Sequence, residues 1–403
     1  MQNKRSVFFY SNYNYYICNK IIEVMKEIEI NNPFVVGKYL SDKYFCDRVE
    51  ETAFLRKQIV NGRDVALISP RRLGKTGLIH HFFNQQDIKE KYHVFFVDIY
   101  ATTSLAEFVY TLGKEIYEQL KPKTTVWKEK FFQTIASFRV GFKLDPMTGT
   151  PTFDLGLGDI LVPQTTLDEI FTYIEEADKP CIIAIDEFQQ ISEYAEKNME
   201  ALLRTKIQMC HRAQFILSGS KRHMMSNMFA SPSKPFYQSA VNMSLEAIPI
   251  QSYSDFATVL FQESNKQIER QAIETVWNLY DGYTWFVQML MNELFALTPP
   301  NGKCTIDMVT EARHNVIMSQ ENTYKDILSR ISPKQKVVMQ AIAKEGIAKN
   351  ITAAKFIKKY NLTSASSVQS AIKLLLKNDL ITQSDNCYRI QDFFLSEWMA
   401  TVF

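Results

Sequence analysis

Residues 65–76 read Val65-Ala66-Leu67-Ile68-Ser69-Pro70-Arg71-Arg72-Leu73-Gly74-Lys75-Thr76, and they join two different patterns. The first four residues form a continuous apolar run, which is typical of a buried strand. A helix-like pattern follows the Gly-Lys-Thr triplet, over residues 78–83. A strand, a loop and a helix in this order predict a phosphate-binding loop, because the loop amides and the helix N-terminus attract anions.

Two side chains of the triplet carry the expected chemistry. Lys75 would reach the β- and γ-phosphates of ATP, and the Thr76 hydroxyl would ligate Mg²⁺. The motif is incomplete, because Ser69 stands where the pattern has glycine. A chance triplet in an ordinary loop is the alternative, and the flanking strand and helix patterns favour the functional interpretation. The residues expected around the phosphates are Ser69, Pro70, Arg71, Arg72, Leu73, Gly74, Lys75, Thr76 and Gly77.

Length and composition limit the number of domains, the classes of partner and the cell compartment that the sequence allows. The chain has 403 residues, enough for about two or three domains. The net charge of +2 is too small to indicate a nucleic acid or membrane partner. Six scattered cysteines without a Cys-x-x-Cys pair indicate reduced thiols in a cytoplasmic protein. We expect residues 1–30 to form an N-terminal extension without signal-peptide features, with Met25 as an alternative start.

Alternating strand and helix patterns between residues 31 and 248 predict an α/β core with a parallel sheet. Continuous apolar runs suit strands that helices cover on both faces. A hairpin pattern at about residues 137–157 is expected to be an insertion in this core. The apolar runs after the first lie at residues 94–98, 181–185, 214–219 and 241–245, and the main helix patterns at 50–60, 104–120, 166–177 and 199–210.

Two further domains are expected after the core. Helix patterns over residues 249–330 predict a helical lid domain, and three helix patterns with a hairpin over 331–403 predict a winged helix. The last segment has ten Lys and Arg against five Asp and Glu, a modest basic bias. DNA contact and protein contact both remain open for it. Its third helix offers an outward face for a major groove, formed by Ser366, Ser367, Gln369, Lys373 and Lys377.

The acidic doublet Asp186-Glu187 ends the third apolar run. Carboxylates at the carboxyl edge of a parallel sheet face the ligand crevice. Asp186 would therefore hold Mg²⁺, and Glu187 would polarise the attacking water as a general base. An acidic pair can also end a strand as a plain surface feature, but the phosphate loop favours the catalytic interpretation.

The next strand ends at Ser218-Gly219-Ser220. A hydroxyl of Ser218 or Ser220 could touch the γ-phosphate or the water, and a merely polar strand end is equally well supported. Arg71 and Arg72 could neutralise phosphate charge or form surface ion pairs. Arg222 is a weaker candidate for the same work.

These motifs resemble the prokaryotic P-loop ATPases of the AAA+/STAND group known as the archaeal ATPase family. Phe45-Cys46-Asp47-Arg48 and the C-terminal stretch from Tyr388 to Phe394, followed by Trp398, add to the resemblance, which spans about residues 31–403. It implies an α/β P-loop NTPase core of the ASCE and AAA+ kind, a helical lid and a C-terminal winged helix. It also implies that Tyr44, Phe45 and Arg48 lie near the adenine.

The expected function is a Mg²⁺-ATP-binding ATPase whose hydrolysis is coupled to movement of the lid and the winged helix. The chain departs from the family pattern, since Gln238 follows Phe236-Tyr237 where relatives often have arginine, and residues 280–290 offer no basic phosphate sensor. An arginine from a neighbouring subunit would then be needed, so an oligomer is compatible with the sequence. The alternatives are a non-enzymatic nucleotide switch read by a protein partner, a DNA-binding regulator and, less well supported, a P-loop kinase.

Overall fold

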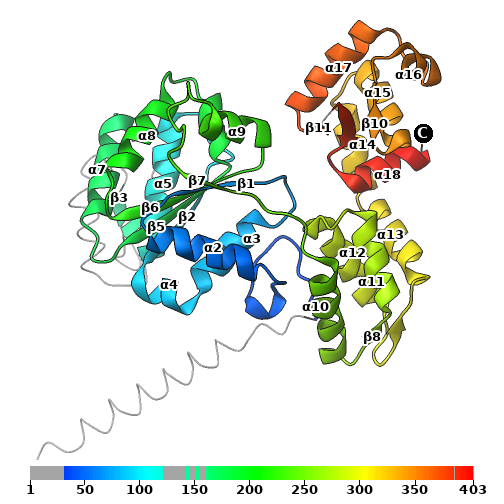
Figure 1. Cartoon of the computed structure of the whole chain (residues 1–403), viewed down its shortest axis with the longest axis horizontal. Coiled ribbons are helices and arrows are strands. Elements are labelled where there is room, and N and C mark those ends of the chain that lie inside the picture. The colour runs from blue at the N-terminus through cyan, green and yellow to red at the C-terminus, as the bar shows by residue number, and fades with distance from the viewer. Residues whose placement is uncertain are drawn as a thin grey trace, which may run out of the picture.

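The computed structural model describes residues 31–120, 142–144, 151–153, 160, 162–384 and 386–402. The expected extension over residues 1–30 and much of the expected hairpin insertion lie outside the described residues. Figure 1 shows an α/β domain on one side and, on the other, an arm formed by the mostly helical remainder of the chain.

A five-stranded parallel sheet forms the centre of the α/β domain, with strand order β2-β5-β6-β1-β7. The register pairs Ile68 with Gly219 and Asp98 with Asp186, so the carboxyl ends of the strands share one edge. The expected parallel α/β fold is therefore confirmed. The strands are β1 (Val65–Ile68), β2 (His93–Asp98), β5 (Cys181–Asp186), β6 (Ala213–Gly219) and β7 (Val241–Met243).

Helices cover both faces of this sheet, which explains why its strands are continuous apolar runs. One hydrophobic cluster joins the sheet to α2 (Val49–Val60), α3 (Lys75–Asn84) and α4 (Gln86–Lys91). A second cluster on the opposite face joins it to α5 (Leu105–Leu120), α7 (Pro163–Glu175), α8 (Met199–Met209) and α9 (Arg222–Ala230). Between α5 and α7, β3 (Phe142–Leu144) and β4 (Pro151–Phe153) pair antiparallel, within the segment where the sequence predicts a hairpin. Two short 3-10 helices also occur, η1 (Asp42–Tyr44) and η4 (Phe188–Glu193).

The arm contains the winged helix and the helices for which the sequence predicts a lid domain, called the lid below. A short parallel pair that the sequence did not indicate joins β8 (Gln267–Ile268) to β9 (Lys303–Cys304). The lid helices are α10 (Ile250–Glu263), α11 (Arg270–Leu279), α12 (Thr284–Leu297), α13 (Met308–Ser319) and α14 (Glu321–Ser329). The winged helix consists of α15 (Pro333–Glu345), β10 (Ala348–Lys349), α16 (Ala354–Lys359), α17 (Ala365–Lys377), β11 (Ile381–Ser384), β12 (Cys387–Ile390) and α18 (Phe393–Val402).

The lid and the winged helix share one hydrophobic cluster. Phe286 of the lid lies against Phe393 and Phe394 of the winged helix, with ring centroids 4.8 and 5.1 Å apart. The N-terminal segment joins the same cluster through Phe34, whose ring lies 5.5 Å from that of Phe261. Because side chains from three stretches of chain interdigitate here, the arm packs as a single unit separate from the two clusters of the sheet.

Two features are absent from the described residues. No helix in the described ranges is both long and apolar enough to cross a membrane. Those ranges also contain no group of three or more His, Cys, Asp or Glu side chains arranged to hold a metal ion. Burial raises the pKa of the Cys46 and Cys181 thiols to about 12, so both stay protonated.

Candidate active site

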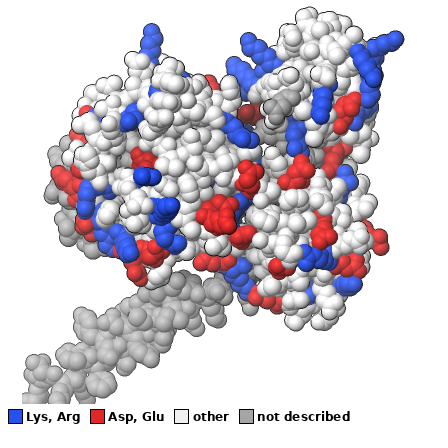
Figure 2. All heavy atoms as spheres, viewed as in Figure 1, with Lys and Arg blue, Asp and Glu red and all other residues white. Residues whose placement is uncertain are grey.

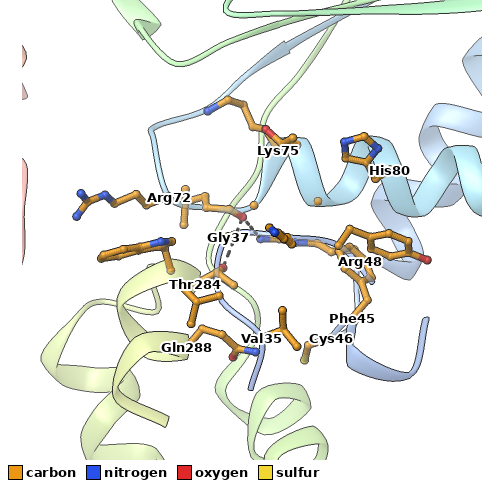
Figure 3. Close-up of a pocket in the computed structure, with 18 of the residues that line it drawn as sticks. Val35, Gly37, Phe45, Cys46, Arg48, Arg72, Lys75, His80, Thr284 and Gln288 are labelled. Atoms are coloured by element: carbon orange, nitrogen blue, oxygen red, sulfur yellow. Dashed lines mark hydrogen bonds between the residues drawn. The ribbon is translucent and has the colours of Figure 1, made fainter. Parts of the chain in front are cut away.

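A cavity of about 690 Å³ lies between the α/β domain and the lid, beside the carboxyl ends of the strands. Figure 3 shows Val35 and Phe45 from the N-terminal segment, Lys75 and His80 from α3, and Thr284 and Gln288 from α12 around the same space. Residues from both domains line it. Any ligand bound there would therefore contact the sheet and the lid together.

The loop after β1 forms one wall. Gly74 has a φ of 92°, a left-handed conformation that glycine adopts without strain, and α3 begins at the next residue. The Lys75 side chain is buried, and its Nζ donates to the carbonyl oxygens of Ser69 at 2.8 Å and Pro70 at 3.1 Å. Burial lowers the pKa of Lys75, and the nearby carboxylates of Asp186 and Glu187 oppose this shift.

Ser69 replaces glycine in the motif without entering the cavity. The residue is fully buried, and its backbone N–H donates to Gly219 at 3.3 Å. Its hydroxyl donates to the Leu245 carbonyl at 3.5 Å, on the β7 side of the loop. The substitution is tolerated because this side chain points into the protein. Ser69 and Pro70 are absent from the cavity lining, whereas residues 71–77 all belong to it.

Thr76 and Asp186 meet at the end of the cavity nearest the sheet. The Thr76 hydroxyl donates to Asp186 Oδ2 at 2.8 Å, and the Glu187 N–H donates to Asp186 Oδ1 at 3.0 Å. A hydroxyl and a carboxylate in contact are hard oxygen donors, the ligand type that Mg²⁺ prefers. The two residues that the sequence predicts as metal ligands are therefore brought together, and the donor set fits that ion.

The Glu187 carboxylate is held by its neighbours. Glu187 adopts a left-handed backbone conformation with a φ of 55° at the start of η4. Its Oε2 accepts a hydrogen bond from the Ser220 hydroxyl at 2.7 Å and another from Gln189 Nε2. A Cβ at Gly219 would lie 2.4 Å from Gln189 Oε1, so a larger residue there would displace the Gln189 side chain that donates to Glu187.

The two serines at the end of β6 differ. Ser220 reaches Glu187, whereas Ser218 is fully buried opposite Leu67 in the sheet and does not line the cavity. Within the described residues the Ser218 hydroxyl has no hydrogen-bond partner. The structure thus brings one of the two predicted hydroxyls to the acidic doublet. Arg222 is exposed at the start of α9 and is also outside the cavity lining.

Arg71 and Arg72 both form ion pairs with the winged helix. Arg71 Nη2 lies 3.5 Å from Asp379 Oδ2, and Arg72 Nη1 lies 2.9 Å from Asp392 Oδ2. The Arg72 guanidinium also lies 4.2 Å from the ring centroid of Trp285 in α12. Both arginines line the cavity, so the loop connects the site to the lid and to the winged helix.

Tyr44, Phe45 and Arg48 line the opposite end of the cavity. The Phe45 ring stacks on His81 of α3 with centroids 4.3 Å apart, and a Cβ on Gly77 would lie 3.5 Å from it. Arg48 is buried, and its Nη2 donates to the Leu73 carbonyl at 3.0 Å, which ties the segment to the loop. All three lie in the cavity as the resemblance implies, and their contact with adenine stays a prediction.

Several lining residues were not identified from the sequence. Tyr253 of α10 and Gln288 of α12 meet through a buried hydrogen bond of 2.7 Å, and Thr284 donates to the Leu73 carbonyl at 3.5 Å. Val35 also lines the cavity, and no role was assigned to it from the sequence. The lid residues carry no local motif that could have placed them here.

A phosphate loop after the first strand of a parallel sheet, with an acidic doublet ending a nearby strand, defines a P-loop ATPase fold. A family model described as an ATPase domain predominantly from Archaea matches residues 45–290, which is more than half of the chain. The chain belongs to this family, as the motifs indicated. A second model, described as a probable winged helix domain, matches residues 322–401 and confirms the C-terminal expectation.

Solved structures share this fold over almost the whole chain. A Walker-type ATPase of Pyrococcus abyssi is 19% identical, with a TM-score of 0.63, and the match covers 91% of this chain and 99% of that one. The ORC2 protein of Aeropyrum pernix, solved as ADPNP and ADP complexes, is 14% identical with a TM-score of 0.54, covering 92% and 98%. No curated protein matches the chain. Family and fold together support a nucleotide-binding P-loop ATPase.

Proposed function

We propose that this protein binds Mg²⁺-ATP in the cavity and hydrolyses it to ADP and phosphate. The observation that carries the proposal is the contact between Thr76 and Asp186 at 2.8 Å, with Glu187 as the adjacent residue. A metal ligand on the loop, a second on a strand end and a carboxylate beside them are the groups that phosphoryl transfer to water needs.

The phosphates would occupy the loop end of the cavity. Lys75 Nζ donates to two loop carbonyls, and phosphate oxygens would be stronger acceptors for it because they are charged. The amides at the start of α3 add the favourable field of a helix N-terminus. Thr76 and Asp186 would hold Mg²⁺, which neutralises phosphate charge and polarises the phosphoryl group when bound.

Glu187 is the proposed general base. Its carboxylate would take the proton of the attacking water, while the β–γ phosphate bridge bond breaks and ADP leaves. In the structure Ser220 and Gln189 both donate to Oε2 of this carboxylate, so they hold it in one orientation while Oε1 would face the water. Slow turnover is the expected consequence of such restraint.

Movement of the arm would accompany the nucleotide cycle. Arg72 contacts both Trp285 of the lid and Asp392 of the winged helix, and it belongs to the loop that would surround the phosphates. A change in the conformation of this loop would therefore alter its contacts with the lid and the winged helix directly. A ligand shifts such an equilibrium only as far as its affinities for the two arrangements differ.

The decisive experiment is ATP turnover by the full chain and by Glu187→Gln, with Glu193→Gln as the matched control on the same 3-10 helix. Removing the base should lower kcat by roughly two orders of magnitude while ATP binding persists. Glu193 is exposed, so its variant should retain wild-type turnover. Equal rates in Glu187→Gln and wild type would reject the base. ATP binding without turnover in the wild type would establish the non-enzymatic switch instead.

Duplex DNA is a second candidate partner, favoured by the outer face of α17. Ser366, Gln369, Lys373 and Lys377 are exposed on that helix, as predicted, and Ser367 is half-buried. Figure 2 shows Lys and Arg side chains projecting from the winged-helix part at the upper right. Side chains of this kind on a winged helix can contact DNA phosphates and base edges.

DNA binding is tested on the full chain by titration with duplex DNA at several salt concentrations. Replacing Lys373 and Lys377 by alanine should weaken binding and reduce the salt slope by about one per lysine. Lys91→Ala, on an exposed site of α4, serves as the control. An unchanged affinity in the double variant would exclude α17 as the DNA contact and favour a protein partner.

A further inference from the structure

Four residues form a continuous polar chain from the winged helix to the proposed catalytic base. Asp379 pairs with Arg71 of the phosphate loop, Arg71 bonds to Ser220 at the end of β6, and Ser220 bonds to Glu187. We propose that Asp379 is a positioning residue that restrains Glu187 through Arg71 and Ser220. This inference rests on the proposed function, because it concerns the base of that same reaction.

The link between Ser220 and Glu187 depends on how the serine hydroxyl is oriented. A hydroxyl has one hydrogen to donate and two lone pairs to accept. Arg71 Nε donates to Ser220 Oγ at 3.3 Å, which leaves the single serine hydrogen for Glu187 Oε2 at 2.7 Å. Bonds in such a chain polarise one another, so the donation from Arg71 strengthens the hold on the carboxylate.

Asp379 fixes the arginine at the start of this chain. Its carboxylate lies 3.5 Å from Arg71 Nη2 and 3.9 Å from Lys221 Nζ, and the two side chains of the arginine pair are each less than a third exposed. Arg71 also lines the cavity beside Lys75. A bound triphosphate would therefore compete with Asp379 for the same guanidinium, because both offer oxygen anions to it.

This competition couples two events. While Arg71 is paired with Asp379, it supports Ser220, and Ser220 holds the Glu187 carboxylate in the orientation seen in the structure, which restrains its reach toward a water. When Arg71 turns to the phosphates, Ser220 loses its donor and its hold on Glu187 weakens. Movement of the winged helix that separates Asp379 from Arg71 has the same effect. The position of the winged helix would therefore control how readily Glu187 acts as the base.

The winged helix does not depend on Asp379 for its attachment. Arg72 pairs with Asp392, Arg389 pairs with Asp281 of the lid at 3.1 Å, and the lid and the winged helix share a hydrophobic cluster. Asp379 has a left-handed backbone, with a φ of 53°, between α17 and β11. Asparagine tolerates that conformation as well as aspartate does. The charge of Asp379 can therefore be removed while the domain stays in place.

The test is steady-state ATP turnover by the full-length Asp379→Asn variant. Loss of one half-buried ion pair should raise kcat roughly threefold to fivefold with an unchanged melting temperature. Asp281→Asn is the matched control, since it makes the same substitution at a left-handed residue, with a φ of 48°, that also pairs with an arginine across the arm. That control should leave kcat unchanged.

A double-mutant comparison tests the route through Ser220. In a Ser220→Ala background, Asp379→Asn should add nothing further to kcat, because the chain is already cut. An unchanged or lower kcat in Asp379→Asn overturns the proposal. So does an equal rise in Asp281→Asn, or full additivity with Ser220→Ala. Wild-type turnover that depends on Glu187 is established first, so these results bear on Asp379 alone.

Discussion

The two ends of the cavity are lined by different kinds of residues from different parts of the fold. The end near the sheet consists of strand and loop residues such as Lys75, Thr76 and Asp186, whose positions follow from the register of parallel strands. The far end consists of aromatic and apolar side chains from the N-terminal segment and from lid helices, including Phe45 and Tyr253. The proposed chemistry thus depends on the sheet and its loops, whereas recognition of a base would depend both on Phe45, which packs on the sheet cluster, and on side chains held by the packing of the arm.

The largest expected effect is a loss of stability in the arm, which supports the far end of the cavity but not the sheet end. Phe34→Ala removes a fully buried ring that packs on Phe261 and Phe295, with centroids 5.5 and 5.9 Å away. The cavity left in the arm should lower the free energy of unfolding by about 3–5 kcal/mol. Thermal unfolding measures this loss, and ATP affinity should fall with it because the far end loses its order.

Leu40→Ala is the control for the unfolding measurement alone, since Leu40 is 43% exposed in the same segment but also lines the cavity. It should change stability little. If Phe34→Ala unfolded at the wild-type temperature, the far end would not depend on the arm, and the contrast between the two ends would fail.

A smaller effect is expected at Arg72, where the two ends are joined. Arg72→Ala removes the ion pair with Asp392 and the stacking on Trp285, which together should stabilise the protein by about 1–2 kcal/mol. Arg72→Lys keeps the charge but loses the flat guanidinium, so it should recover only part of the loss. Urea titration measures both, with Arg63→Ala at an exposed site as the control. Full recovery by lysine would show that stacking contributes nothing.

The smallest effect concerns the protonation of Lys75. Burial lowers its pKa below the ordinary 10.5, so the ammonium loses its proton earlier than an exposed lysine as pH rises. Phosphate favours the charged form. ATP affinity should therefore fall with rising pH, by less than about tenfold per pH unit, and binding should take up a proton in alkaline buffer. Calorimetry in two buffers of different ionisation enthalpy measures this uptake.

Lys75→Ala should abolish that proton uptake together with most of the affinity. Uptake that persists in the variant would assign the proton to another group. No uptake in the wild type would show that Lys75 remains fully charged in spite of its burial.

The sheet end could be predicted from the sequence because its signals are local or follow from strand direction. A strand, a loop and a helix are contiguous around Gly74, and the carboxyl ends of parallel strands share an edge, which placed Asp186 beside Thr76. The far end could not be predicted, since Tyr253 and Gln288 belong to helices whose docking is decided by side-chain packing. Two-residue strands such as β8 are also too short to leave a pattern.

Arg71 and Arg72 of the loop show the same contrast between local sequence signals and contacts that depend on tertiary packing. The sequence left phosphate contact and ion pairing open for Arg71 and Arg72, and the structure shows ion pairs with Asp379 and Asp392. Those partners lie about three hundred residues further along the chain, where no spacing rule connects them to the loop. Three helices and the hairpin of the winged helix were predictable from local patterns, whereas α18 and the two-residue strand β10 were not predicted.

In the part of the chain that the structure describes, the passages between the α/β domain and the arm near residues 45–46 and 245–248 both lie beside the cavity. Phe45 packs on the sheet cluster while its neighbour Cys46 belongs to the arm cluster, and Leu245 and Ile248 divide in the same way. Two short chain crossings of this kind would permit the arm to rotate about the line that joins them, and would resist translation of the arm along the α/β domain. Opening of the cavity, as proposed above, would then be a swing about an axis at its own rim.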